Sequence, residues 1–204
     1  MKGLYAITPD VSSTEALERL VAQALEGGIA ALQYRNKHAD APLRGEQAAA
    51  LLRMTRARGV PLIVNDDVAL AAAIDADGAH LGREDGEIAA ARRALPGKLL
   101  GASCYASFEA AEAALSAGAD HVAFGSVFAS TTKPVARRAP LELLSRARSL
   151  GAPVIAIGGI TIENAPQVVR AGADCVAVIS DLFRASDIAG RATAYRRLFE
   201  KGPA

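Results

Sequence analysis

The chain has 204 residues, of which 51% are hydrophobic and 22% are charged. This length can bury one sizeable core but is short for two, so we expect a single domain over residues 1–204. The 23 Lys and Arg residues almost balance the 22 Asp and Glu residues, and the formal net charge of +1 provides no overall field that would attract nucleic acid or an anionic membrane. Recognition of any anion must therefore depend on local groups.

The sequence also argues against a secreted, membrane-bound or disulfide-stabilised protein. The apolar run near the N-terminus is broken by Pro9, and no later run is long enough to cross a bilayer. Cys104 and Cys175 show no CxxC spacing and no neighbouring histidine cluster, so we expect two buried free thiols. A cytoplasmic protein without a membrane or nucleic-acid partner is the expectation, and formation of a homo-oligomer stays open.

Short β-type runs alternate with helical patterns along the chain, which is typical of repeated strand–helix units in a parallel sheet. Most runs are almost continuously apolar, as expected for strands covered on both faces. Eight such units predict an α/β fold with a closed (β/α)8 barrel, the TIM barrel. An open doubly wound sheet is the alternative, but the GxGxxG turn expected after its first strand is missing. The expected strands are residues 4–8, 30–34, 61–65, 78–81, 99–103, 121–125, 153–158 and 175–180.

Polar residues and glycines mark the expected helix ends. Ser12, with Glu15 three residues later, predicts a capping box at the start of the first helix. The Gly27-Gly28 pair ends that helix, and Ser107 begins a similar helix further along the chain. The helices are therefore expected to lie between the strands, as a barrel of repeated units requires.

Polar residues also gather at the expected carboxyl ends of the strands, where barrels of this class carry their active sites. A single cation at a strand end is usually a solvated surface residue. Here, however, Arg35, Lys37 and Lys133 would point into one mouth, where they can neutralise phosphates, and the Gly158-Gly159 pair lets backbone amides approach an anion. We expect two anion pockets, one near strands 2 and 6 and one near strands 7 and 8. The candidate residues are Gln33, Arg35, Lys37, Asn65, Asp66, Asp85, Ser103, Ser130, Thr131, Thr132, Lys133, Gly158, Gly159, Ile179 and Ser180.

Two carboxylates among these cations require a separate explanation. Asp66 and Asp85 follow adjacent expected strands and can approach each other, but neighbouring carboxylates repel unless a proton or a cation separates them. Mg²⁺ suits such a pair, because it binds one or two carboxylates and completes its shell with water and phosphate oxygens. Helix capping is the alternative for both residues, and it is the preferred interpretation of the neighbouring Asp67.

The histidines and Cys104 have no expected catalytic role. His38 lies in a polar loop, His80 lies inside an apolar strand, and His121 begins a strand on the face of the barrel away from catalysis. No Ser or Cys nucleophile pattern accompanies them, so acid–base catalysis by histidine is a weak hypothesis. Cys104 is expected to pack in the core.

An ordered set of motifs runs over nearly the whole chain: GLYAIT, LQYRNK, IVNDD, GAHLGRED, GASC, VAFGSVFASTTKP, AIGGIT and VAVIS. This ordered set resembles the thiamine phosphate synthase family. The resemblance implies a Mg²⁺-dependent enzyme that joins a pyrimidine, carried as its methyl diphosphate, to a thiazole phosphate, with release of pyrophosphate. It implies a dissociative reaction, in which the diphosphate leaves before the thiazole nitrogen attacks.

The resemblance also implies a role for each matching residue. Lys133, Arg35 and Lys37 would act in catalysis by neutralising the departing pyrophosphate, and Asp66 and Asp85 would hold Mg²⁺. The pyrimidine diphosphate would contact Gln33, Tyr34, Arg35, Asn36, Lys37, Asn65, Ser103 and Lys133. The thiazole phosphate would contact Ser130, Thr131, Thr132, Gly159, Ile179 and Ser180.

The chain departs from the family pattern at a few positions. Ser126 stands where many members have Pro, and Ser130 stands where they have Thr but keeps the hydroxyl. Asp181 stands where a small residue is common, and its charge would repel the thiazole phosphate unless it turns away. A related thiazole tautomerase would carry a His in place of Ser126, whereas a phosphate-ligand sensor would need no metal-assisted site. A phosphosugar isomerase would show an acid–base pair at the strand ends, so the synthase is preferred.

Overall fold

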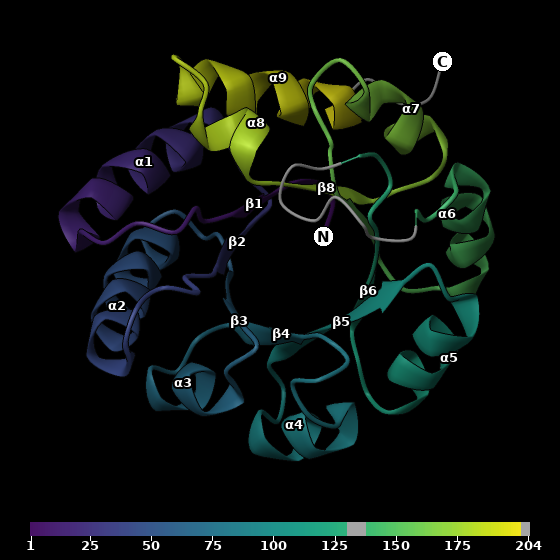
Figure 1. Ribbon diagram of the computed structural model, residues 1–204, viewed down its shortest axis with the longest axis horizontal. Coiled ribbons are helices and arrows are strands. Elements are labelled where there is room, and N and C mark those ends of the chain that lie inside the picture. Colours follow the sequence, from purple (N-terminus) through teal and green to yellow (C-terminus); the bar gives the residue numbers. More distant parts are fainter. Residues whose placement is uncertain (130–137, 201–204) are drawn as a thin grey trace.

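The protein forms a closed barrel of eight parallel strands that pair in sequence order, with β8 returning to β1. The structure is a computed structural model that describes residues 1–129 and 138–200. Figure 1 shows the barrel from one end, with the helices in a ring around it. The predicted TIM barrel is thus confirmed. The strands are β1 (Gly3–Ile7), β2 (Ala31–Tyr34), β3 (Leu62–Asn65), β4 (Gly78–Leu81), β5 (Leu99–Tyr105), β6 (His121–Phe124), β7 (Val154–Ile157) and β8 (Cys175–Val178).

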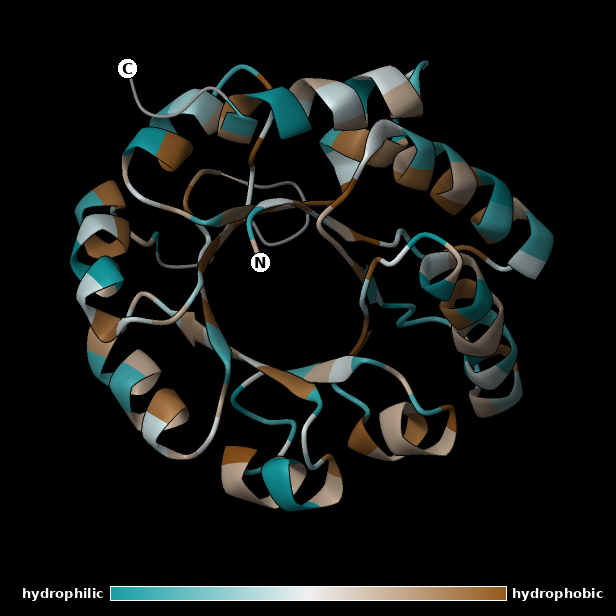
Figure 2. Cartoon of the chain, turned by 180° about the vertical axis from the view of Figure 1, so that it is seen from behind, coloured by the Kyte–Doolittle hydropathy of each residue, from teal (hydrophilic) through white to brown (hydrophobic). Residues whose placement is uncertain are grey.

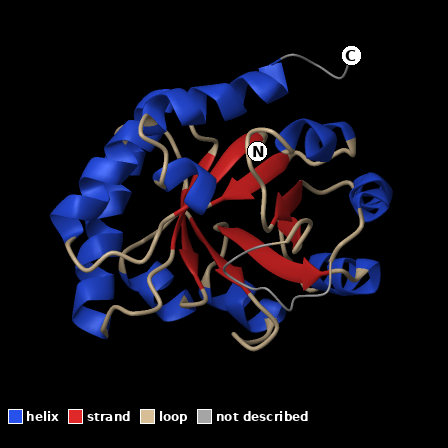
Figure 3. Cartoon of the chain, turned by 45° about the horizontal axis from the view of Figure 1, so that its top comes forward, coloured by secondary structure: helices blue, strands red, loops and turns tan. Residues whose placement is uncertain are grey.

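A helix follows each strand, and the chain adds a short extra helix after β8. Figure 3 shows the strands enclosed by helices, with loops joining the two layers. The helices are α1 (Thr14–Gly27), α2 (Ala41–Arg56), α3 (Val68–Ala73), α4 (Ile88–Ala94), α5 (Phe108–Ser116), α6 (Leu141–Ala147), the 3₁₀ helix η1 (Arg148–Leu150), α7 (Ala165–Arg170), α8 (Ser180–Phe183) and α9 (Ile188–Glu200). Among the described residues, none of these helices is both long and apolar enough to span a bilayer.

Side-chain caps place several helix starts as the sequence predicts. Asp67 accepts a hydrogen bond from the backbone N–H of Leu70 at 2.8 Å, and Ser107 accepts one from Ala110 at 3.1 Å. The predicted cap of α1 is wrong by one residue. Ser13, and not Ser12, accepts the hydrogen bond from Ala16, because it is the residue with an extended backbone directly before the helix.

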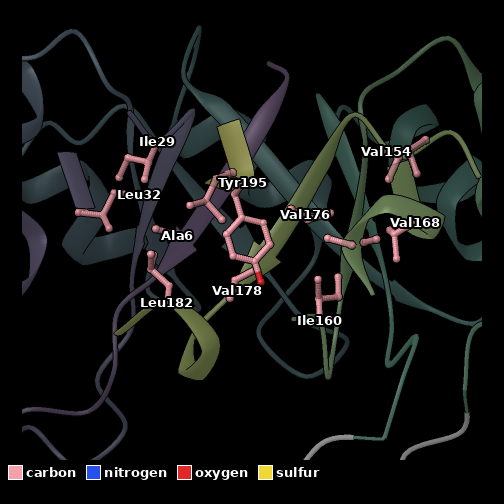
Figure 4. Close-up of a cluster of buried hydrophobic side chains, with 14 of the residues drawn as sticks. Ala6, Ile29, Leu32, Val154, Ile160, Val168, Val176, Val178, Leu182 and Tyr195 are labelled. Atoms are coloured by element: carbon pink, nitrogen blue, oxygen red, sulfur yellow. The ribbon is translucent and has the colours of Figure 1, made fainter. Parts of the chain in front are cut away.

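Two apolar layers hold the barrel together. The larger one lies between the strands and the helices, and Figure 4 shows part of it, with Tyr195 of α9 among residues of β8 such as Val176 and Val178. A smaller layer fills the barrel itself and includes Tyr5, Ile7 and Ile63. Figure 2 shows the strands as mostly hydrophobic and many outer helix residues as hydrophilic. The expected burial of two free thiols, Cys104 and Cys175, is also confirmed.

Candidate active site

A cavity of about 830 Å³ opens at the carboxyl ends of the strands. All eight strands contribute to its wall, from Ile7 of β1 to Ala177 of β8. Its volume falls in the range of about 300–1,000 Å³ that is usual for small-molecule sites. Eleven of the residues predicted from the sequence line it: Gln33, Arg35, Lys37, Asn65, Asp66, Asp85, Ser103, Gly158, Gly159, Ile179 and Ser180.

The other six predicted residues are not found among the described residues of this wall. Ser130, Thr131, Thr132 and Lys133 fall outside the described residues. Tyr34 and Asn36 line a neighbouring cavity of about 590 Å³ instead. Alternation along β2 sends Gln33 into the barrel and Tyr34 towards α2, whereas Arg35 and Lys37 line both cavities.

Tyr34 and Asn36 belong to a buried polar network that supports the loop after β2. The Tyr34 hydroxyl donates to Gln47 Oε1 at 2.9 Å, and Asn36 Nδ2 donates to the same oxygen at 3.0 Å. Asn36 Nδ2 and Gln47 Nε2 both donate to the carbonyl oxygen of Val11, each at 2.8 Å. These contacts position the loop that carries Arg35 and Lys37, and Tyr34 and Asn36 support the wall of the larger cavity without lining it.

Two residues at the end of β1, which the sequence reasoning missed, position the cationic side of the cavity. Thr8 is fully buried, and its hydroxyl exchanges hydrogen bonds of 2.8 Å with the backbone N–H and C=O of Arg35. Both carboxylate oxygens of Asp10 lie 3.3 Å from Arg35 Nη1. Asp10 Oδ1 also accepts a hydrogen bond from the backbone N–H of Lys37 at 2.8 Å. The signal was available, because Thr8 and Asp10 follow the first strand just as the predicted residues follow theirs.

The carboxylates of Asp66 and Asp85 lie next to each other in the cavity wall. Burial raises the pKa of Asp66 to about 6, and the Asp85 carboxylate adds to the rise, while Lys37 opposes it. Asp85 is itself oriented by the backbone N–H of Gly82, which donates to its Oδ2 at 2.8 Å. The described residues contain no group of three or more His, Cys, Asp or Glu side chains that could hold a metal. A pair of carboxylates fits an ion that takes most of its ligands from water and phosphate, which is typical of Mg²⁺.

His80 is a further residue of the cavity that the sequence reasoning passed over. Its Nε2 lies 2.9 Å from the Oγ of Ser103, and both residues line the cavity. Burial lowers the pKa of His80 to about 3, so the ring is neutral at physiological pH. The flanking Ala79 and Leu81 pack outside the barrel, which leaves His80 facing inward. A polar residue at an inward position of an apolar strand was the available signal.

Glycines bring two loops together on the opposite side of the cavity. Gly158 has a φ of 103°, and a Cβ on it would lie 2.2 Å from Ser126 Oγ. A Cβ on Gly159 would lie 2.2 Å from the carbonyl oxygen of Ala129. Any larger residue would therefore push the loop after β6 away from the loop after β7. Ile179 and Ser180, at the start of α8, complete this part of the wall.

Asp181 lines the cavity beside Ser180, but its charge is paired. Its Oδ2 accepts hydrogen bonds from Tyr195 Oη at 2.7 Å, from Arg191 Nη1 at 2.8 Å and from the backbone N–H of Ile162 at 3.2 Å. These contacts join the loop after β7, α8 and α9. The repulsion expected from the sequence is thus reduced by Arg191, and the carboxylate holds the loop after β7 against α8 and α9.

Comparisons with known proteins agree with this geometry. The family model described as thiamine monophosphate synthase matches residues 4–182. The thiamine-phosphate synthase of Aromatoleum aromaticum is 56% identical over 202 residues, covering 98% of this chain and 97% of the relative. That of Methylobacillus flagellatus is 54% identical over 200 residues, covering 98% and 96%.

A solved structure supports the same relationship. The thiamine phosphate pyrophosphorylase from Pyrococcus furiosus superposes with a TM-score of 0.87 at 39% sequence identity, covering 98% of this chain and 96% of that one. The match spans the whole barrel, including the strand ends that form the cavity. The chain therefore belongs to the thiamine monophosphate synthase family and is a transferase of thiamine biosynthesis.

Proposed function

We propose that the protein condenses 4-amino-2-methyl-5-(diphosphooxymethyl)pyrimidine with 4-methyl-5-(2-phosphooxyethyl)thiazole, giving thiamine phosphate and pyrophosphate. The observation that carries the proposal is the division of one cavity into two sides. Arg35, Lys37 and the Asp66–Asp85 pair lie on one side, and the Gly158-Gly159 loop lies on the other. Two phosphorylated substrates can thus bind together with their reacting ends between the two sides.

The cationic side suits the pyrimidine diphosphate. Arg35 and Lys37 can neutralise the phosphates, and Lys133 joins them in the proposal from the sequence alone. Gln33 is buried and its amide donates to Tyr5 Oη at 3.2 Å, which fixes the orientation of the amide in the cavity wall. Asn65 and Ser103 supply further hydrogen-bonding groups in the same wall.

The glycine side suits the thiazole phosphate. Among the described residues, the backbone N–H groups of Gly159 and Ser180 have no backbone acceptor, and we propose that they donate to the phosphate. Ile179 offers an apolar contact for the thiazole ring, and the hydroxyl of Ser180 offers a further donor. Ser130, Thr131 and Thr132 are proposed for the same phosphate from the family motif.

Asp66 and Asp85 are proposed to hold Mg²⁺. Their mutual repulsion, expressed in the raised pKa of Asp66, would be relieved by a divalent ion in contact with both. When bound, the ion supplies positive charge to the diphosphate oxygens. The choice of Mg²⁺ over other hard divalent ions rests on the all-oxygen character of the donors.

The proposed reaction needs charge stabilisation rather than a protein nucleophile. The C–O bond of the methyl diphosphate breaks with its electron pair passing to pyrophosphate, and the thiazole nitrogen then forms a C–N bond to the pyrimidine methylene cation. Arg35 and Lys37 stabilise the charge that develops on the leaving group. The two sides of the cavity hold the nitrogen and the methylene carbon in position for the second step.

A pyrophosphate-release assay tests this proposal. Purified protein is mixed with both substrates, with each substrate alone, and with or without Mg²⁺. Pyrophosphate is expected only when both substrates and Mg²⁺ are present, and Arg35→Met should lower the rate at least tenfold, because it removes a charged contact to the leaving group. Release that is absent under every metal condition would overturn the proposal.

A further inference from the structure

Three nitrogen atoms inside the barrel lack a hydrogen-bond partner within the described part of the chain. They are Nδ1 of His80 and both ring nitrogens of His121, and all three atoms are buried. An unpaired buried polar atom is destabilising, so buried polar groups are nearly always paired. We therefore expect these nitrogens to take part in a hydrogen bond that the orientations of the two rings allow.

The two histidines share one layer of the barrel with Gly101. Gly101 is the partner of His80 across β4 and β5, and it is also the partner of His121 across β5 and β6. The stagger of neighbouring strands explains this arrangement, because it brings the start of β6 level with the middle of β4. His121 begins β6 and is not among the residues that line the cavity, as expected, and its ring centroid lies 5.8 Å from that of His80.

Gly101 leaves the space between the two rings open. A Cβ at residue 101 would lie 2.2 Å from His121 Nε2 and 2.4 Å from His80 Nδ1. Both nitrogens therefore border the room that a side chain would fill, and no hydrogen bond joins them in this structure. Burial lowers the pKa of His121 to about 4 and that of His80 to about 3, so both rings are neutral near pH 7.

Two neutral imidazoles can pair only when one nitrogen donates and the other accepts. If His121 Nε2 carries its proton, His80 Nδ1 accepts, and the proton of His80 then lies on Nε2, which faces Ser103 at 2.9 Å. This arrangement gives both rings the Nε2–H form, which neutral histidine side chains favour in water. The opposite arrangement would require the less favoured form in both rings.

We propose that His121 is a positioning residue that fixes the tautomer of His80 and so makes Ser103 a hydrogen-bond donor to the ligand. The chain runs from His121 Nε2–H to His80 Nδ1, from His80 Nε2–H to Ser103 Oγ, and from the Ser103 hydroxyl into the cavity. A donor at this point selects an acceptor, such as an unprotonated ring nitrogen of the pyrimidine. This last link rests on the function proposed above, whereas the first two links do not.

Nitrogen-15 NMR of the ligand-free wild-type protein at neutral pH tests the first two links. The chain has three histidines, and His38→Ala identifies the signals of the exposed one. His80 is expected to carry its proton on Nε2 and to show a hydrogen-bonded, unprotonated Nδ1. A proton on Nδ1 of His80 would overturn the proposal, and this result requires no variant in the barrel to fold.

Two substitutions of His121 test the third link. His121→Phe keeps a ring but removes the donor, and His121→Gln keeps an N–H close to the position of Nε2. His121→Phe should raise the KM for the pyrimidine diphosphate about fivefold, which corresponds to one neutral hydrogen bond, and leave the KM for the thiazole phosphate unchanged. His121→Gln should restore most of the loss.

The two measurements separate this inference from the function on which it partly depends. An unchanged His80 spectrum in His121→Phe would refute the role of His121. An altered spectrum with an unchanged pyrimidine KM would support the hydrogen-bond chain and would overturn the placement of Ser103 against the pyrimidine. Equal rises in both KM values would indicate a general loss of structure and would count against the positioning role.

Discussion

Removing the charge of Asp66 should stabilise the metal-free protein at neutral and alkaline pH. Burial and the Asp85 carboxylate raise the pKa of Asp66 from 3.8 to about 6. An acid whose pKa is higher in the folded state stabilises the fold at low pH, and this contribution is lost as the pH rises through the folded value. Ionised Asp66 is therefore destabilising above about pH 6, and Asp66→Asn removes that penalty.

The size of the effect follows from the same pKa values. The difference between 3.8 and about 6 corresponds to about 3 kcal/mol at full strength. Because Asp66 is only partly buried, screening by solvent reduces the expected gain to about 1 kcal/mol. The substitution adds no backbone strain, since Asn tolerates the left-handed conformation found at Asp66, where φ is 64°.

Urea denaturation in the presence of a chelator measures this gain. Asp66→Asn should raise the free energy of unfolding at about pH 8 and have little effect at about pH 4, where the carboxyl group is largely protonated. Asp85→Asn is the matched control, and it should also stabilise the protein by relieving Asp66. The double variant should gain less than the sum of the two, because both act on one repulsion. A gain at pH 4 equal to that at pH 8 would refute the electrostatic explanation.

The remaining predictions concern residues that hold the cavity walls in place. Asp10→Ala should lower kcat/KM about tenfold but change the free energy of unfolding by less than about 1 kcal/mol, because the ion pair with Arg35 is near the surface. Steady-state kinetics and urea denaturation measure the two effects, and an unchanged kcat/KM would contradict the prediction. Asp181→Asn should destabilise the protein by about 2 kcal/mol and raise the KM for the thiazole phosphate alone, because it weakens the contacts to Tyr195 and Arg191. Thermal unfolding and separate KM measurements test this second effect, and an equal rise in the KM for the pyrimidine diphosphate would argue against it.

The sequence alone was sufficient for the fold because each strand–helix unit is specified locally. Apolar runs predicted all eight strands, with boundaries that differ from the observed ones by at most two residues. Caps such as Asp67 and Ser107 placed helix starts correctly, because a cap depends only on residues three positions apart. The order of units then leaves few topologies other than the barrel.

The sequence also located most of the cavity wall, since carboxyl ends of parallel strands must meet at one end of a barrel. Side-chain alternation in the sequence grouped Gln33, Arg35 and Lys37 as residues of the cavity wall. The family motif alone did not reveal that Tyr34 and Asn36 contact Gln47. That contact joins a strand to a helix and depends on how the two pack. No sequence pattern within the strand or the helix predicts this contact.

Only the tertiary structure decided which residues support those that line the cavity. Asp10 meets Arg35 because β1 and β2 are neighbours, and Asp181 meets Tyr195 because α9 folds back over α8. His80, Gly101 and His121 form one layer only through the stagger of three strands. Local pattern determines which elements form and which way each side chain points, whereas closure of the barrel determines which distant side chains come into contact, because register between strands is set by packing around the whole ring.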